Sequence, residues 1–105
     1  MSYTNLTSHE RAFLRSKANT LTAIFQLGKG GINENFIEQM NTALEARELV
    51  KISLLETCEL SVKEAAEEIC HRTGAQSVQM FGRKIVFFRQ AKDADKRIYF
   101  LPKKK

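Results

Sequence analysis

The sequence has few cysteines, few histidines and no long apolar run, and each of these absences excludes a class of protein. Its two cysteines, Cys58 and Cys70, cannot form the disulfide framework of a small secreted domain, so we expect both to be partly buried free thiols. No apolar stretch approaches the roughly 18 residues that a membrane span needs. The N-terminus lacks the basic-then-apolar layout of a signal peptide, which predicts a cytoplasmic protein with no membrane partner.

Side chains for catalysis or metal binding are equally scarce. His9 and His71 are the only histidines, and neither has an acidic partner at a suggestive spacing. Cys70 and His71 are adjacent, and adjacent residues on a helix point about 100° apart, which does not suit a shared metal ion. We therefore expect a non-catalytic protein with no cofactor, no metal site and no small-molecule substrate.

The charge is distributed unevenly along the 105 residues. Residues 1–32 and 71–105 carry net formal charges of +3 and +8, whereas residues 33–70 carry −6, giving +5 in total. If the two basic ends meet in the fold, the surface is polarised and favours a polyanion such as nucleic acid. Chance segregation of charge onto solvated faces explains the same pattern equally well.

The hydrophobic periodicity predicts alternating helices and strands. Capping signals support the helices: Thr7 and Ser61 each begin a capping box, Asn33 can cap a helix, and Gly74 suits a helix C-terminus. Helices are expected over about 8–19, 33–46 and 61–73, and strands over about 23–27, 49–55, 78–80 and 85–88, with a turn at Gly82.

The predicted fold class is α/β, a compact α-β-α-β-α-β-β sandwich with a four-stranded mixed sheet. Strands separated by helices imply parallel crossovers, and the last two strands imply a hairpin. There is no internal repeat and no linker rich in proline or glycine, so residues 1–90 are expected to form one domain, followed by a basic tail over 91–105. Within that tail, residues 98–101 are apolar, and the pattern leaves open whether they dock on the domain.

The stretch QLGKGGIN places three glycines and a lysine between apolar positions, at the end of the first predicted strand. A dinucleotide fingerprint requires a third glycine where Asn33 stands, and a phosphate-binding Walker loop requires a Gly-Lys-Ser/Thr that is absent. The remaining functional interpretation is a Gly-x-x-Gly clamp, Gly28-Lys29-Gly30-Gly31, whose backbone approaches a phosphate closely. A turn that needs glycine only for its geometry is the alternative.

Basic residues from three other predicted elements could extend such a clamp. A surface of this kind suits structured RNA better than one small anion. Free phenylalanine and tyrosine side chains could stack on bases, but the four strands are expected to need most aromatic residues for their core. We therefore predict no base-stacking platform like that of an RRM domain. The candidate RNA contacts are Gly28, Lys29, Gly30, Gly31, Arg11, Arg15, Arg83, Lys84 and Arg89.

Taken together, the motifs resemble the CRM domain, a name that abbreviates chloroplast RNA splicing and ribosome maturation. They cover about residues 5–90, and a lone domain of this length is similar to the bacterial YhbY-type members. The matching motifs are Leu6-Thr7, Arg11, Phe13-Leu14-Arg15, Gln26-Leu27-Gly28-Lys29-Gly30-Gly31, Ala43-Leu44-Glu45-Ala46-Arg47-Glu48-Leu49-Val50-Lys51, Thr73-Gly74-Ala75 and Gly82-Arg83-Lys84-Ile85-Val86.

The resemblance implies an RNA-binding module similar in fold to the C-terminal domain of translation initiation factor three. It further implies association with ribosomal RNA or pre-ribosomal particles of the large subunit, with the Gly28–Gly31 loop and Lys29 as the RNA contact. A monomer is expected. The acidic helices support an alternative function, a protein–protein adaptor that docks a basic ribosomal protein or assembly factor.

Overall fold

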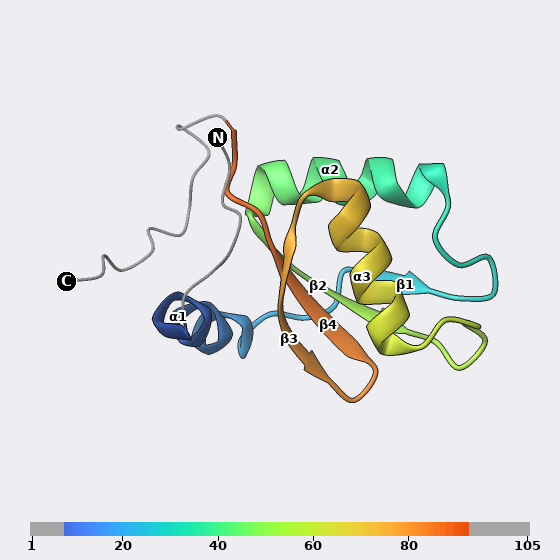
Figure 1. Cartoon of the computed structure of the whole chain (residues 1–105), viewed down its shortest axis with the longest axis horizontal. Coiled ribbons are helices and arrows are strands. Elements are labelled where there is room, and N and C mark those ends of the chain that lie inside the picture. Colours follow the sequence, from blue (N-terminus) through green and yellow to red (C-terminus); the bar gives the residue numbers. More distant parts are fainter. Residues whose placement is uncertain (1–7, 93–105) are drawn as a thin grey trace.

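The computed structural model describes residues 8–92, which form three helices and four strands in the predicted order (Figure 1). The expected cap at Thr7, and the apolar residues 98–101, lie outside the described residues. The elements are α1 (Ser8–Ala18), β1 (Phe25–Leu27), α2 (Glu34–Arg47), β2 (Leu49–Leu54), α3 (Val62–Thr73), β3 (Gln76–Phe81) and β4 (Lys84–Phe88).

The predicted helix-capping signals inside the described range are confirmed. The Asn33 side chain accepts a hydrogen bond from the Phe36 amide at 2.8 Å at the start of α2. Ser61 and Glu64 form a reciprocal capping box at the start of α3. Gly74 ends α3 in the left-handed conformation, with φ of 79°. Local sequence therefore determines where α2 begins and where α3 begins and ends.

The sheet is four-stranded and mixed, as predicted, with the order β1-β2-β4-β3. β1 pairs with β2 in parallel, and β4 runs antiparallel to both β2 and β3. It follows that β1, β2 and β3 all point the same way. Their carboxyl ends lie at one edge of the sheet, the carboxyl edge, where the β1–α2 loop, the β2–α3 loop and the β3–β4 hairpin project (Figure 1).

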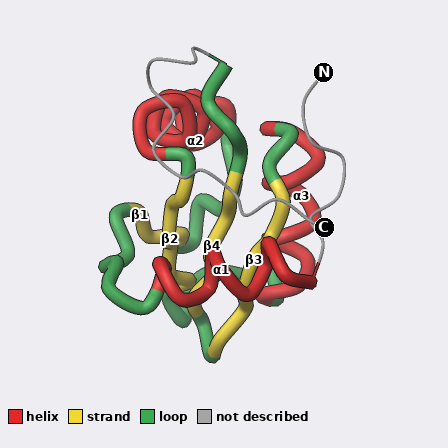
Figure 2. Tube along the Cα trace, turned by 90° about the vertical axis from the view of Figure 1, so that its left-hand side faces the viewer, coloured by secondary structure: helices red, strands yellow, loops and turns green. Residues whose placement is uncertain are grey.

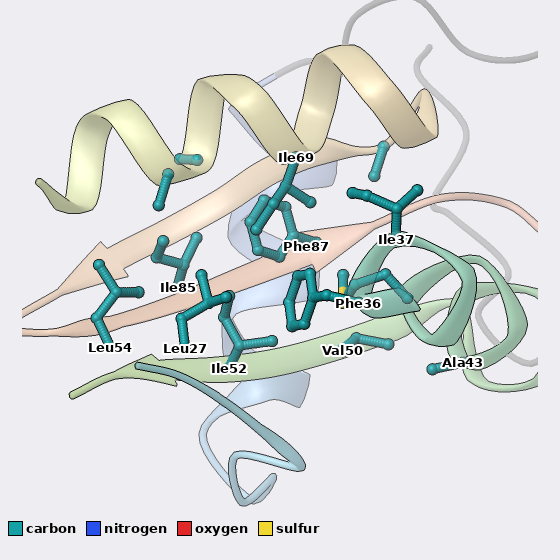
Figure 3. Close-up of a cluster of buried hydrophobic side chains, with 14 of the residues drawn as sticks. Leu27, Phe36, Ile37, Ala43, Val50, Ile52, Leu54, Ile69, Ile85 and Phe87 are labelled. Atoms are coloured by element: carbon teal, nitrogen blue, oxygen red, sulfur yellow. The ribbon is translucent and has the colours of Figure 1, made fainter. Parts of the chain in front are cut away.

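The hydrophobic core lies on both faces of the sheet. On the inner face, α2 and α3 bury the larger cluster, in which Phe36 and Ile69 pack over Ile52 and Phe87 (Figure 3). On the outer face, α1 crosses in front of the strands (Figure 2) and buries a smaller cluster. That cluster consists of Leu14, Ala18, Leu49, Val78, Val86 and Phe88.

Two residues differ from the sequence-based expectation. Glutamate side chains in such an acidic stretch are ordinarily solvated, but Glu48 is fully buried. It adopts a φ of 64° just after α2, and its carboxylate accepts a hydrogen bond from the Ala91 amide at 2.7 Å. The core was also expected to absorb the strand aromatics, which Phe87 and Phe88 confirm, yet Phe81 is 76% exposed.

The two thiols agree with the prediction. Cys58 is buried, Cys70 is half-buried, and both are free. Within residues 8–92, no cluster of histidine, cysteine and acidic side chains could hold a metal ion. In the same part of the chain, every helix is too short or too polar to cross a membrane.

Candidate nucleic-acid interface

The glycine loop is a tight turn at the carboxyl edge. The Gly31 amide donates a 3.0 Å hydrogen bond to the Gly28 carbonyl, which leaves Lys29 and Gly30 exposed at the tip. Gly31 has a φ of 65°, a left-handed conformation that disfavours any side chain. Gly30 has no such constraint: its φ is not left-handed, and a Cβ built there meets no atom within 4 Å. The fold therefore explains glycine at 31 but not at 30.

The first turn of α2 contributes less to an anion site than its position suggests. The Phe36 amide already donates a hydrogen bond to the Asn33 side chain, and the Ile37 amide donates to the Asn33 backbone carbonyl at 3.0 Å. Glu34 adds a highly exposed carboxylate to the same turn. Both features reduce the attraction of the helix N-terminus for a phosphate. The exposed backbone of the loop and Lys29 are therefore better placed than the first turn of α2 to bind a phosphate.

Arg83 connects the loops of the carboxyl edge. Its Nε donates to the Leu54 carbonyl at 3.0 Å and its Nη2 donates to the Leu55 carbonyl at 2.7 Å. The Leu55 amide in turn donates to the Leu27 carbonyl at 2.8 Å, next to the glycine loop. The hairpin and the ends of β1 and β2 are thus joined, and the structure brings Gly28–Gly31, Arg83 and Lys84 to one edge.

The α1 arginines lie on the outer face of the sheet, away from this edge. Arg11 is half-buried, and its Nη1 donates to the carbonyl of Ser77 at the start of β3. Arg15, one turn later, is also half-buried. Arg11 therefore has a role in holding α1 against the sheet, in addition to any role in binding.

Arg89 lies at the opposite end of the sheet from the glycine loop. Its Nη1 donates to Asn41 Oδ1 at 2.7 Å and to the Thr73 carbonyl at 2.8 Å, and its Nη2 donates to the Asn41 carbonyl at 3.2 Å. Burial lowers the pKa of its guanidinium, and nearby Glu45 opposes that shift. The structure does not bring Arg89 together with the loop. Instead, the hydrogen bonds of the Arg89 side chain connect β4 to α2 and to the end of α3.

An acidic hollow separates the glycine loop from α3. It has a volume of about 620 Å³, and Lys29, Gly30 and Gly31 form part of its wall. The opposite wall carries the carboxylates of Glu59, Glu64, Glu67 and Glu68. These charges repel phosphates on the α3 side of the loop, so a polyanion is favoured on its other side.

Two side chains that the sequence did not single out as contacts lie beside Lys84. Phe81 is its cross-strand partner in the β3–β4 hairpin, and Lys51 lies one same-face position further along the sheet, opposite Val86. Strand alternation could have placed Lys51 and Lys84 on the same face. Nothing in the sequence indicates that α1 leaves this part of the face uncovered.

The fold and the carboxyl edge together define a small α/β domain whose conspicuous feature is a glycine loop beside a basic hairpin. The model of the CRS1 / YhbY (CRM) domain family matches residues 6–89. The chain belongs to that family.

Named relatives agree with this assignment. "Probable RNA-binding protein YqeI" of Bacillus subtilis is 48% identical over 88 residues, which cover 84% of this chain and 92% of the relative. A protein of Haemophilus influenzae named "RNA-binding protein" is 27% identical over 91 residues, covering 87% of this chain and 92% of that protein.

A solved structure supports the fold. The solution structure of the hypothetical protein SAV1595 of Staphylococcus aureus, described as a candidate RNA-binding protein, superposes with a TM-score of 0.75. It is 41% identical and covers 93% of this chain and all of its own.

Proposed function

We propose that this protein is a non-catalytic, monomeric RNA-binding protein of the cytoplasm. Its RNA is ribosomal RNA in precursors of the large ribosomal subunit, bound through the carboxyl edge of the sheet. Membership of the CRM family and the names of two relatives support RNA as the partner. Large-subunit assembly follows from what the family resemblance implies.

The observation that carries the proposed contact is the open tip of the glycine loop. Gly30 is glycine although neither its backbone nor its surroundings require it, and Lys29 is exposed beside it. A position without a Cβ lets a sugar-phosphate backbone come close to the loop amides, while the ammonium supplies charge. Arg83 and Lys84 add basic groups at the same edge, and Arg11 and Arg15 extend the contact over the outer face.

Substituting Lys29 by alanine tests this contact. We expect weaker binding to large-subunit precursor RNA and a log–log salt dependence that is shallower by about one unit, because one phosphate contact is lost. Arg47→Ala is the matched control, since it removes one exposed positive charge from the other end of α2. Equal affinity and slope for Lys29→Ala and the wild type would remove the loop from the interface.

The acidic hollow favours a second candidate, an adaptor that docks a basic ribosomal protein or assembly factor. Four glutamates line one hollow of about 620 Å³, which suits lysine or arginine side chains of a partner. This function predicts co-sedimentation with pre-ribosomal particles that survives nuclease treatment and is lost in Glu67→Lys. Loss of co-sedimentation on nuclease treatment alone supports RNA binding instead.

A further inference from the structure

α1 covers only part of the outer face of the sheet. α1 packs over the end of that face where Leu49, Val78 and Phe88 lie. Towards the carboxyl edge, the same face carries polar, basic and aromatic side chains that are not part of the cluster under α1. We call this surface the open patch; it comprises Gln26, Lys51, Ser53, Gln79, Phe81 and Lys84.

The sheet register aligns the open patch in two rows. Gln26 is opposite Ser53, Ser53 is opposite Lys84, and Lys84 is opposite Phe81, so one row crosses all four strands. The second row contains Lys51, Val86 and Gln79. Directly opposite side chains in a sheet lie about 5 Å apart, so the Lys84 stem and the Phe81 ring are neighbours. The first row begins two residues before the glycine loop.

The register also explains why Phe81 is on this face. β3 has an irregularity between Ser77 and Gln79, which leaves Val78 as an extra residue in the strand. Val78 packs against α1, and the strand then continues with Gln79 and Phe81 opposite Val86 and Lys84. A bulge of this kind re-aims the side chains that follow it.

The open patch has the chemistry of a surface for an anionic, aromatic ligand. A hollow of about 350 Å³ lies on it, lined by Asn19, Lys51, Gln79, Phe81, Lys84 and Val86, without a carboxylate among them. Lys51 Nζ donates one hydrogen bond to the Leu21 carbonyl at 3.1 Å, and an ammonium has two more N–H groups to donate. The two hollows therefore differ in charge: glutamates line the acidic hollow beside α3, whereas lysines line this one on the outer face.

We propose that the open patch binds a single-stranded RNA segment, with an unpaired base stacked on Phe81 and the adjoining phosphates on Lys84 and Lys51. This inference rests on the RNA binding proposed above and extends it from the loop to the sheet. Stacking requires a base face that a duplex does not expose, so the ligand is single-stranded. Gln79 and Asn19 place amide groups where they can hydrogen-bond to base edges.

A tryptophan introduced in place of Phe81 reports stacking directly. The chain contains no tryptophan, so the tryptophan fluorescence of the Phe81→Trp variant, excited where tyrosine absorbs little, comes from this site alone. We expect strong quenching by a single-stranded oligonucleotide of large-subunit precursor sequence, weak quenching by its duplex, and none by inorganic polyphosphate. Gln39→Trp, exposed on α2 over the opposite face, is the control and should show little quenching by any of them.

Two further variants separate stacking from apolar contact. Phe81→Leu retains apolar surface and should weaken single-strand affinity about tenfold, since stacking on one aromatic contributes that order of affinity. Phe81→Tyr retains the ring and should bind as the wild type does. Phe81 is 76% exposed, so neither variant should change the unfolding midpoint.

The outcomes distinguish this inference from the function on which it rests. If the wild type binds no RNA, the proposed function fails. If the wild type binds and Lys29→Ala weakens binding, but Phe81→Leu matches the wild type, only the stacking site is overturned. Quenching of the Phe81→Trp variant by polyphosphate as strong as that by the single strand overturns it too. The stacking site is also overturned if Phe81→Leu keeps its RNA affinity but loses nuclease-resistant association with ribosomal particles. In that case the open patch binds a protein.

Discussion

Arg83 Nη2 donates a 2.7 Å hydrogen bond to the carbonyl of Leu55, while its Nε donates to Leu54 at 3.0 Å. The backbone supports the same junction, because the Leu54 amide donates to the Arg83 carbonyl at 2.8 Å. One guanidinium thus connects the hairpin to the end of β2 and, through Leu55 and Leu27, to the strand that precedes the glycine loop. A residue predicted as an RNA contact also positions the loops of the carboxyl edge.

Replacing Arg83 by lysine separates these two roles. Lysine keeps the charge but lacks the planar fork, so we expect a loss of about 1–2 kcal/mol in the free energy of unfolding. Chemical denaturation of Arg83→Lys, Arg83→Ala and the wild type measures it. Lys84→Ala is the control, because that side chain is exposed on the neighbouring position and should change stability by about 0.5 kcal/mol or less. An Arg83→Lys variant as stable as the wild type would show that these bonds contribute little.

Gly30 and Gly31 of the glycine loop should respond differently to replacement by alanine. Gly31→Ala places a side chain at a φ of 65° and should cost about 1 kcal/mol of stability. Gly30→Ala meets open space, so its unfolding free energy should stay within about 0.5 kcal/mol of the wild type. RNA affinity should nevertheless fall in Gly30→Ala, because the new Cβ blocks close approach of the backbone. Filter binding and denaturation of the same preparations test both statements, and unchanged affinity in Gly30→Ala would favour a loop that serves only as a turn.

Arg89 should act on stability more than on RNA binding. Its guanidinium donates to Asn41 and to the Thr73 carbonyl, and lysine cannot reproduce that fork, so Arg89→Lys should cost about 2 kcal/mol. Arg72→Lys, whose ion pairs with Glu34 and Glu68 are longer at 3.7 and 3.6 Å, should cost about 0.5 kcal/mol or less. Thermal unfolding gives the comparison. A folded Arg89→Lys protein with full stability and much weaker RNA binding would instead make Arg89 a direct contact.

Much of the fold was predictable because its signals are local. Asn33, Ser61 and Gly74 determine helix ends through hydrogen bonds or backbone conformations that involve only neighbouring residues. The alternation in β2, the continuous apolar run of β4 and the turn at Gly82 likewise follow from a few consecutive residues. The parallel crossovers and the final hairpin then followed from general rules of chain connection.

The partners of single side chains were not predictable in the same way. Glu48 lies in a run of residues typical of a solvated helix end, but the chain returns at Ala91 and buries its carboxylate. Arg89 could not be distinguished from a surface cation in the sequence, because its hydrogen-bond partner Asn41 lies 48 residues away along the chain. Burial of such groups depends on which distant segment covers them, and this information is not local.

Residue type and short-range geometry were enough to establish the order of elements, the helix caps, the glycine loop with Lys29 and the uneven charge along the chain. Only packing of the folded chain decided that α1 covers part of the outer face and that four glutamates line a hollow beside the glycine loop. It was also needed to show that Phe81 is exposed beside Lys84. The physical reason is that the position of one helix determines which side chains of a sheet meet solvent and which meet the core.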